Sequence, residues 1–345
     1  MAFNRVMKPI FLFLFLLQFV NAGKFITLKG PFLMPKVRIG KDYIYIYDIG
    51  KTTVYIYDKL KGKFISKFGK KGQGPGEALH INDLYILPEY ILIEAPGKLL
   101  YFNFNGLFKK EIILPYHTRC IPFVNDQFVC KKVNYGFIKE GVIAKAKIII
   151  TNKDFKTLKV LAQKEIKKKF RRKKLEIKKM VYFGFKIWNK KIYIGDTEKG
   201  FIIEIFDFSG KRIYKIKKNT PKQRVEKTVK STYINLLKKG VGENRFNNIM
   251  EHYRFIFPTY YPPYMNFLVR DGKIYVFTWD IDLKNKLQKV LILDEKGNFK
   301  KTVMLPIYSL RDNMKGFLTD IKDNRYYYFT LNKNDEWELH DFIIE

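Results

Sequence analysis

The chain has 345 residues and a formal net charge of +33 at pH 7, with 47% hydrophobic and 17% aromatic residues. This apolar content is enough for a large core and excludes disorder over most of the chain. The aromatics are mainly 31 Phe and 23 Tyr, which favour strands over helices.

The positive charge favours anionic partners, such as nucleic acid, acidic lipid headgroups or acidic polysaccharide. Lys residues far outnumber Arg residues and are spread along the whole chain, whereas surfaces that bind nucleic acid specifically usually concentrate Arg. We therefore expect no specific nucleic-acid partner. An anionic surface stays open as a partner, although a compositional bias of the source genome explains the charge at least as well.

Residues 1–22 have the pattern of a signal peptide. Arg5 and Lys8 form a short positive region, residues 9–20 form an apolar core, and Val20-Asn-Ala22 fits a cleavage site. The apolar run is short for a bilayer span, and an uncleaved membrane anchor is the alternative. We expect a mature chain that begins near Gly23, is secreted or periplasmic, and is not an integral membrane protein.

Short alternating strands follow, and a Gly-rich segment at 68–77 (FGKKGQGPGE) interrupts them. Strands are expected at 42–48, 53–57 and 63–68 before this segment, and at 82–87, 90–94, 99–104 and 108–113 after it. A Gly- and Pro-rich crossing between two repeated β-units is typical of a β-propeller, where the chain passes from the rim of one blade to the centre of the next.

Turns that carry Gly, Asn or Asp divide the chain into six units, at 32–68, 78–114, 119–161, 181–218, 264–305 and 317–345. Between the fourth and fifth units, Thr220-Pro-Lys-Gln223 has the form of a helix capping box, and Gly240 marks a helix end. We therefore expect a helical insertion at 220–254. The last unit has room for only three strands, so we expect 24–28 to be the strand that closes it.

These features resemble the bacterial six-bladed β-propeller family related to NHL-repeat proteins. In those repeats a G-x-G-x-G-x-F/E segment leads into the innermost strand of a blade. Its matches here are Gly72, Gly74, Pro75, Gly76 and Glu77, whereas Ala78 stands where a large aromatic residue often follows. The resemblance implies an all-β, six-bladed propeller. The motif is a structural signature, so it supports the fold far more than an activity.

The two cysteines, Cys120 and Cys130, flank a turn at Asn125-Asp126. If this turn is a two-residue hairpin loop, Ile121 rather than Cys120 faces Cys130. A disulfide would then need a bulge or a longer loop. Two ordinary buried thiols are the alternative that we favour.

Polar residues on the inner strands of a propeller face its channel and are candidate binding residues. His80 follows the Gly-rich crossing, although a surface or core histidine is the more common case. The candidate channel residues are His80, Asn82, Asp83, Arg270 and Asp320. Tyrosines in the Pro-rich segment 258–264 could stack on a sugar or peptide, the alternative being a bracket that seats the helices; they are Tyr260, Tyr261 and Tyr264.

The run 167–174 (KKKFRRKK) lies where the third blade passes to the fourth, and it could bind phosphates or an acidic glycan. A solvated loop or short basic helix is the alternative that we favour. The basic residues of this run are Lys167, Lys168, Lys169, Arg171, Arg172, Lys173 and Lys174.

Catalytic signatures are scarce. The four histidines have no metal-binding spacing, and the acidic run at 280–285 lacks the central Gly and the bidentate Glu of a calcium loop. No nucleophile elbow or P-loop is present. We therefore expect a binding or interaction module for a protein, peptide or glycan, with no cofactor and with calcium left open. A metal-dependent hydrolase or lyase with its site at the central channel is the alternative.

Overall fold

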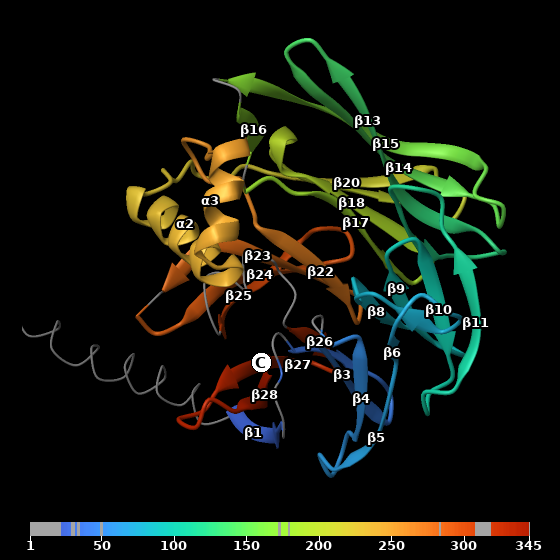
Figure 1. Ribbon diagram of the computed structural model, residues 1–345. Helices are drawn as coiled ribbons and strands as arrows, with labels where there is room; N and C mark the ends of the chain where they lie inside the picture. The colour runs from blue at the N-terminus through green and yellow to red at the C-terminus, as the bar shows by residue number, and fades with distance from the viewer. Residues whose placement is uncertain are drawn as a thin grey trace, which may run out of the picture.

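The computed structural model describes residues 22–28, 32, 35–48, 51–171, 174–178, 180–282, 284–307 and 319–344. In this part of the chain, six sheets of four or more strands follow one another around a ring (Figure 1). The all-β, six-bladed propeller expected from the sequence is therefore confirmed. The expected signal peptide lies outside the described residues, except for its last residue, Ala22.

The first three blades run through the chain in order, each from its inner to its outer strand. The first contains β2 (Pro35–Ile39), β3 (Tyr43–Asp48), β4 (Thr53–Asp58) and β5 (Phe64–Phe68). The second contains β8 (Asp83–Ile86), β9 (Ile91–Ala95), β10 (Lys98–Phe102) and β11 (Phe108–Ile113). The third contains β12 (Thr118–Pro122), β13 (Phe128–Ile138), β14 (Gly141–Thr151) and β15 (Thr157–Arg171), extended by β16 (Lys174–Lys178) and β21 (Tyr253–Ile256).

The last three blades repeat the design. The fourth contains β17 (Phe183–Trp188), β18 (Lys191–Asp196), β19 (Phe201–Phe206) and β20 (Arg212–Lys218), with a 3-10 turn at Thr197–Lys199. The fifth contains β22 (Asn266–Arg270), β23 (Lys273–Asp282), β24 (Leu287–Asp294) and β25 (Phe299–Pro306). The sixth contains β26 (Asp320–Lys322), β27 (Arg325–Leu331), β28 (Trp337–Ile343) and, as its outer strand, β1 (Ala22–Thr27).

Each blade buries both of its faces, because the side chains of a strand alternate between them. In β3, Ile44 and Ile46 pack toward the sixth blade, whereas Tyr45 and Tyr47 pack toward the second. Among the described residues, six apolar clusters of this kind fill the spaces between neighbouring blades. The core is therefore a ring of interfaces between blades rather than one central mass.

The Gly-rich crossing joins the first blade to the second. Its strands β6 (Lys70–Lys71) and β7 (Glu77–Ala78) pair in parallel, and the amide of Gly74 donates to Glu77 Oε2 at 3.2 Å. A side chain at Gly72 would meet that carboxylate at 1.9 Å, and Gly76 has a φ of +72°. The glycines thus allow the chain to fold around Glu77, which supports a structural role for the motif.

Blade three is longer than its sequence pattern indicates. Its fourth strand was expected to end at 161, but β15 continues to Arg171 and pairs with β14 as far as Gly141. The basic run at 167–174 therefore extends a sheet, and the loop or short helix expected there is wrong. Lys167 to Lys169 belong to β15 and Lys174 to β16, whereas Arg172 and Lys173 lie outside the described residues.

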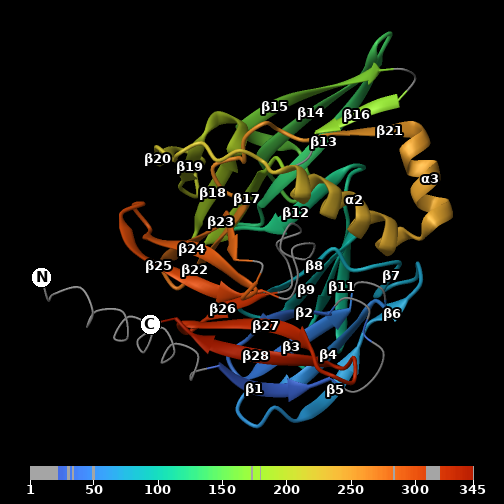
Figure 2. The same ribbon diagram turned by 90° about the vertical axis from the view of Figure 1, so that its left-hand side faces the viewer.

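The helical insertion consists of α2 (Lys227–Val241) and α3 (Glu243–His252), which lie on the side of the ring where β16 and β21 project (Figure 2). The capping box expected at Thr220 does not start a helix, since α2 begins seven residues later at Lys227. The residues before α2 pair with the Pro-rich segment instead. The amide of Val225 donates to Thr259 O at 3.0 Å, and that of Tyr261 donates to Gln223 O at 2.8 Å.

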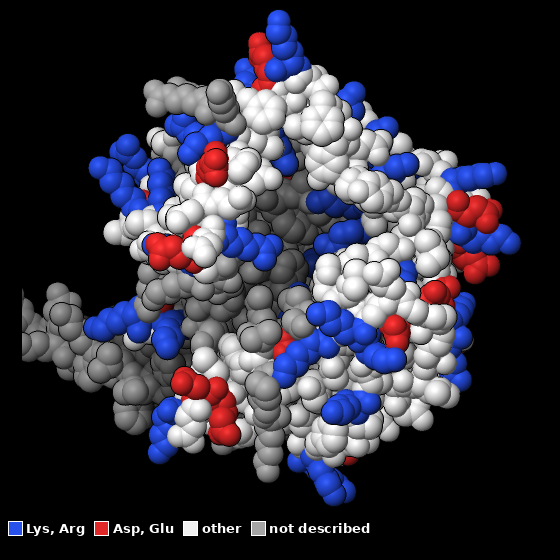
Figure 3. Space-filling view, in the orientation of Figure 1, with Lys and Arg blue, Asp and Glu red and all other residues white. Residues whose placement is uncertain are grey.

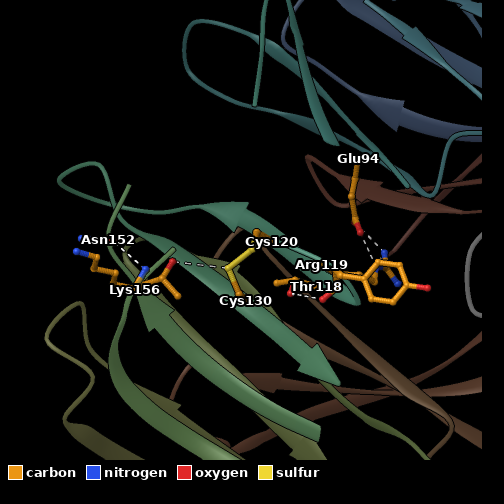
Figure 4. Close-up of a disulfide and its surroundings, with 9 residues drawn as sticks. Glu94, Thr118, Arg119, Cys120, Cys130, Asn152 and Lys156 are labelled. Carbon is orange, nitrogen blue, oxygen red and sulfur yellow. Dashed lines mark hydrogen bonds and ion pairs between the residues drawn. A yellow bond between two sulfur atoms is a disulfide. The ribbon is translucent and has the colours of Figure 1, made fainter. Parts of the chain in front are cut away.

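Cys120 and Cys130 form a disulfide between β12 and β13 (Figure 4). Asn125 and Asp126 both have a positive φ, as in a two-residue hairpin turn. The amide of Phe123 donates a hydrogen bond to Gln127 O, and the amide of Gln127 donates one to Val124 O. Two residues of the first strand therefore face one residue of the second, and this extra residue places Cys120 opposite Cys130. The two free thiols favoured from the sequence are therefore wrong, because the hairpin contains a bulge.

Candidate functional site

Charged side chains converge on the channel from the inner strands of all six blades. Four of these strands contribute Arg38 (β2), Arg119 (β12), Lys186 (β17) and Arg270 (β22), and Lys36 and Lys322 also lie on β2 and β26. The other two, β8 and β26, begin with Asp83 and Asp320. Figure 3 shows a hollow at the centre of one face with Lys and Arg side chains along its wall.

Asp83 is the carboxylate around which several of these cations lie. Arg38 Nη2 donates to Asp83 Oδ1 at 2.5 Å, and the hydroxyl of Tyr47 donates to the same oxygen at 2.8 Å. Burial opposes its ionisation, but Arg38, Lys36 and Lys186 lower the pKa of Asp83 well below its usual value. Asp83 is therefore an ionised anchor for the basic residues of the channel.

Asp320 is also buried, and it joins three blades. Its carboxylate accepts hydrogen bonds from the amides of Ile39 and Ile321, both at 3.0 Å. Arg270 Nε donates to it at 3.3 Å. These contacts fix Asp320 and Arg270 in the wall of the ring, so both candidates have structural partners as well as a place on inner strands.

A cavity of about 500 Å³, here called the channel cavity, opens beside the inner strands of the second, third and fourth blades. Its volume suits a small ligand. It has walls from five of the blade-three strands as well as from β8, β9 and β17. The charged residues that line it are Asp83, Glu94, Arg119, Lys131, Lys164, Lys168, Lys178, Lys186 and Glu198.

The three carboxylates of the channel cavity already have basic partners. Asp83 pairs with Arg38, and Glu94 accepts two hydrogen bonds from Arg119, one of them at 2.8 Å (Figure 4). Glu198 pairs with Lys164 at 2.6 Å and with Lys178 at 3.3 Å. The acidic residues are thus neutralised within the wall.

Three lysines of the cavity have no carboxylate partner among the described residues: Lys131, Lys168 and Lys186. Lys131 Nζ donates to Phe183 O at 2.5 Å and lies 5.3 Å from the centre of that ring. Lys168 Nζ lies 5.7 Å from the ring centre of Tyr135. For Lys186, no hydrogen bond or ion pair is found in the described part of the chain.

The pKa of Lys186 reflects this environment. Burial lowers it to about 8, and repulsion from Arg38, Arg270 and Arg119 adds to this effect against the attraction of Asp83. The pKa of Lys131 is also about 8, again chiefly because of burial. The cavity therefore holds ammonium groups that the protein itself only partly stabilises.

A second cavity, here called the proline–tyrosine cavity, adjoins the first. It has a volume of about 610 Å³, and both cavities are lined by Lys178, Val181 and Glu198. Its wall includes Tyr260, which is 47% exposed, and Tyr261, whose ring stacks on Trp279 at 5.2 Å. Four prolines complete its apolar surface: Pro221, Pro258, Pro262 and Pro263.

Tyr264 does not line the proline–tyrosine cavity. Its side chain is fully buried, packs against Phe201 and Phe267, and donates a hydrogen bond to Ile202 O at 2.9 Å. It holds the Pro-rich segment against the fourth blade. The candidate aromatic surface therefore consists of Tyr260 and Tyr261 alone.

The other candidate residues from the sequence do not form one site. His80 is exposed and lines neither cavity, and Asn82, which also lines neither, accepts a hydrogen bond from Lys36 Nζ through its backbone oxygen. Of the basic run, Lys168 lines the channel cavity, Lys167 pairs with Glu165 at 3.7 Å, and Lys174 donates to Met250 O. The run is therefore divided between several environments.

Sequence reasoning missed Arg38, Arg119, Lys131 and Lys186, although a signal for two of them exists. Arg119 and Lys186 are each the single basic residue of an inner strand that is otherwise largely apolar, TRCIP in β12 and FGFKIW in β17, whereas Arg38 shares β2 (PKVRI) with Lys36. An isolated cation in such a strand indicates a position that faces the channel. Lys131 lies on a second strand and carries no such signal.

In the described ranges, no three His, Cys, Asp or Glu side chains gather as metal ligands. Over the same residues, no helix has the length and apolar character needed to cross a membrane.

Residues 32–185 match the sequence profile of a family described as "6-bladed beta-propeller". No curated protein matches the chain. Among solved structures, a Bacteroides fragilis protein described as exported is 14% identical, and the alignment covers 94% of this chain and 96% of that chain with a TM-score of 0.54.

Two further structures are less similar. The β-propeller domain of Cps50 (Swd1) from Myceliophteria thermophila is 10% identical, with 92% and 99% of the two chains covered and a TM-score of 0.43. A luciferin-regenerating enzyme is 9% identical, with 91% and 92% covered and a TM-score of 0.40. At these identities the matches concern the fold and not the activity. The six blades and the profile match over residues 32–185 together identify the chain as a six-bladed β-propeller protein.

Proposed function

We propose that the protein is an exported β-propeller that binds a ligand in the channel cavity and the adjoining proline–tyrosine cavity. The observation that carries this proposal is the shared wall of Lys178, Val181 and Glu198, which joins two hollows of about 500 and 610 Å³. Ligand sites are typically concave, largely apolar and supplied with a few fixed polar groups. The proline–tyrosine cavity has this character, and the wall of the channel cavity adds charged side chains to its apolar ones.

Export is supported by two independent features. Residues 1–22 have the composition of a signal peptide. The only two cysteines of the chain are bonded to each other, and disulfides persist mainly outside the cytoplasm. A mature chain that begins near Gly23 keeps most of β1.

A binding module is favoured over an enzyme because the carboxylates of the channel cavity are already paired with Arg or Lys. A metal-dependent hydrolase needs carboxylate or imidazole groups that are free to hold the ion. Here Asp83 and Glu94 are committed to Arg38 and Arg119.

The test is a thermal-shift screen of the mature protein against sugars, short peptides and organic acids, followed by calorimetry of the hits. The Val181→Trp variant puts a large ring at the wall shared by both cavities, where Val181 is 40% exposed. Leu60→Trp, at a position 91% exposed in the first blade, is the matched control.

We expect the hits to bind at least about tenfold more weakly to Val181→Trp and unchanged to Leu60→Trp. Equal binding by both variants would place the ligand elsewhere and contradict the proposal. Calcium or zinc retained in stoichiometric amounts through dialysis would favour the metal-dependent enzyme instead.

A further inference from the structure

The channel cavity carries more positive charge than its own acidic residues can neutralise. Its carboxylates are engaged by Arg38, Arg119, Lys164 and Lys178, as described above. This leaves Lys131, Lys168 and Lys186 as cations of the wall without an acidic partner in the described part of the chain. The excess charge is local, because all three line one hollow, and it differs in this respect from the dispersed surface lysines.

Keeping Lys131 and Lys186 charged in this wall is unfavourable for the free protein, because both are partly buried near other cations. Lys186 is partly buried and faces three arginines, with Asp83 as the opposing charge. Removing a cation from water without a partner costs free energy, and neighbouring like charges add to the cost. A methionine would fill the same space in β17 at lower cost, so an anionic ligand gives a physical reason for a lysine there.

Two of the three ammonium groups, those of Lys131 and Lys168, have contacts within the protein before any ligand arrives. Lys131 donates one hydrogen bond to Phe183 O and lies over the ring of the same residue. An ammonium group has three donors, so two of them stay available to a ligand. Lys168 lies over the ring of Tyr135. Groups fixed in this way lose little conformational entropy when they bind.

We propose that the channel cavity binds a small polyanion, a molecule with two or more carboxylate or sulfate groups, between Lys131, Lys168 and Lys186. The inference rests on the proposed function, because it names the ligand class of the same cavity. The volume of about 500 Å³ admits a molecule of up to a few sugar units and not a folded macromolecule. The ligand's uncharged part can extend past Val181 toward Tyr260 in the second cavity.

The primary experiment is calorimetric titration of the mature protein, residues 23–345, with citrate, sodium sulfate and trigalacturonate at low ionic strength. We expect at least one of these probes to bind with a Kd below about 1 mM. Tighter binding of trigalacturonate than of citrate identifies the carboxylates of an acidic sugar as the source, and the reverse order identifies a free organic acid. Failure of all three to bind overturns the inference.

The site is assigned by a charge-matched pair of variants. Lys131→Met with Lys186→Met removes two cavity cations, whereas Lys109→Met with Lys217→Met removes two exposed cations from the outer strands β11 and β20. Both variants lower the net charge equally, so long-range attraction changes alike. We expect about 100-fold weaker binding for the cavity variant and less than threefold for the control. Equal losses in the two variants would show binding to the general positive field.

A measurement on the unmodified protein does not depend on how the variants fold. Lys131 and Lys186 have a pKa of about 8 and are partly deprotonated near that pH, so a bound anion should draw protons onto them. Calorimetric titrations at pH 8 in two amine buffers of different ionisation enthalpy should reveal that the protein takes up protons when the anion binds. The affinity for the anion should be lower at pH 9.5 than at pH 8. Absence of proton uptake contradicts the inference. If a neutral ligand binds and is blocked by Val181→Trp, the proposed function stands and the polyanion does not.

Discussion

Single residues of the channel show why its charges were difficult to predict. Asp83, Arg270 and Asp320 were expected on inner strands, and the structure gives each an ionic partner. Lys186 was missed, because a lysine in a chain with 66 Lys and Arg residues carries little information by itself. Its meaning depends on the blades that face it, and the sequence of β17 does not contain those neighbours.

Replacing Lys186 by Met should stabilise the protein at neutral pH. The folded state lowers the pKa of this lysine from 10.5 to about 8, chiefly through burial, with Arg38, Arg270 and Arg119 repelling it and Asp83 attracting it. The charged form is therefore disfavoured by folding, and this penalty is present below pH 8 and is relieved as the pH rises toward 10.5. We expect Lys186→Met to raise the free energy of unfolding by about 1–3 kcal/mol at pH 7.

Urea unfolding of both proteins at pH 7 and pH 10 checks this sign. The advantage of Lys186→Met should shrink at pH 10, where the wild-type lysine is neutral in the folded protein. Comparing the two proteins at each pH removes the effect of the other lysines. A variant that is less stable than wild type at pH 7 would contradict the electrostatic account.

At the scale of elements, the strands were predictable from the sequence, whereas the start of helix α2 and the bulge in the β12–β13 hairpin were not. Alternation in sequences such as YIYIYD of β3 predicts a strand buried on both faces, and the blade clusters have that pattern. The capping box at Thr220 failed because residues 223–225 bond to the Pro-rich segment. The bulge opposite Gln127, which sets the cysteine register, has no signature in the side chains around it. Local propensity is overridden in both cases by pairing with other segments.

The Gly-rich crossing between the first two blades offers a matched test of packing against backbone strain. Gly76 and Gly97 both have a φ of +72°, but a methyl group at Gly76 would lie 2.9 Å from Phe108, whereas one at Gly97 meets nothing within 4 Å. Ala at either position costs about 1 kcal/mol for its backbone conformation.

We therefore expect Gly76→Ala to be less stable than Gly97→Ala by about 1–2 kcal/mol in urea unfolding, because Phe108 must move. Equal losses would mean that the crossing adapts freely and that the motif acts only through its φ angle.

For the whole molecule, closure of the ring joins the two ends of the described chain. β1 pairs with β28 from Ala22 to Thr27, and it places Ile26 in the cluster between the sixth and first blades, with Leu28 following it there. The apolar residues of 24–28 indicate a strand, but their partner lies more than 300 positions away, at Glu338–Phe342. Only the count of strands in the last blade pointed to it.

Removing this strand should open the ring. A chain that starts at residue 29 lacks Ile26 and Leu28, which are 5% and 1% exposed, and it leaves the edge of β28 unpaired. We expect a loss of about 4 kcal/mol or more relative to a chain that starts at residue 23, together with self-association through the free edge. Urea unfolding and light scattering measure both effects. Equal stability and a monomeric state would show that β1 does not contribute to closure.

The central claim is that the channel cavity holds an anionic ligand, and a crystal structure of the mature protein with trigalacturonate or citrate tests it most directly. The account predicts carboxylate oxygens within about 3.2 Å of the ammonium groups of Lys131 or Lys186. A ligand found only on the outer blades, with the cavity closed by the protein's own side chains, would contradict it.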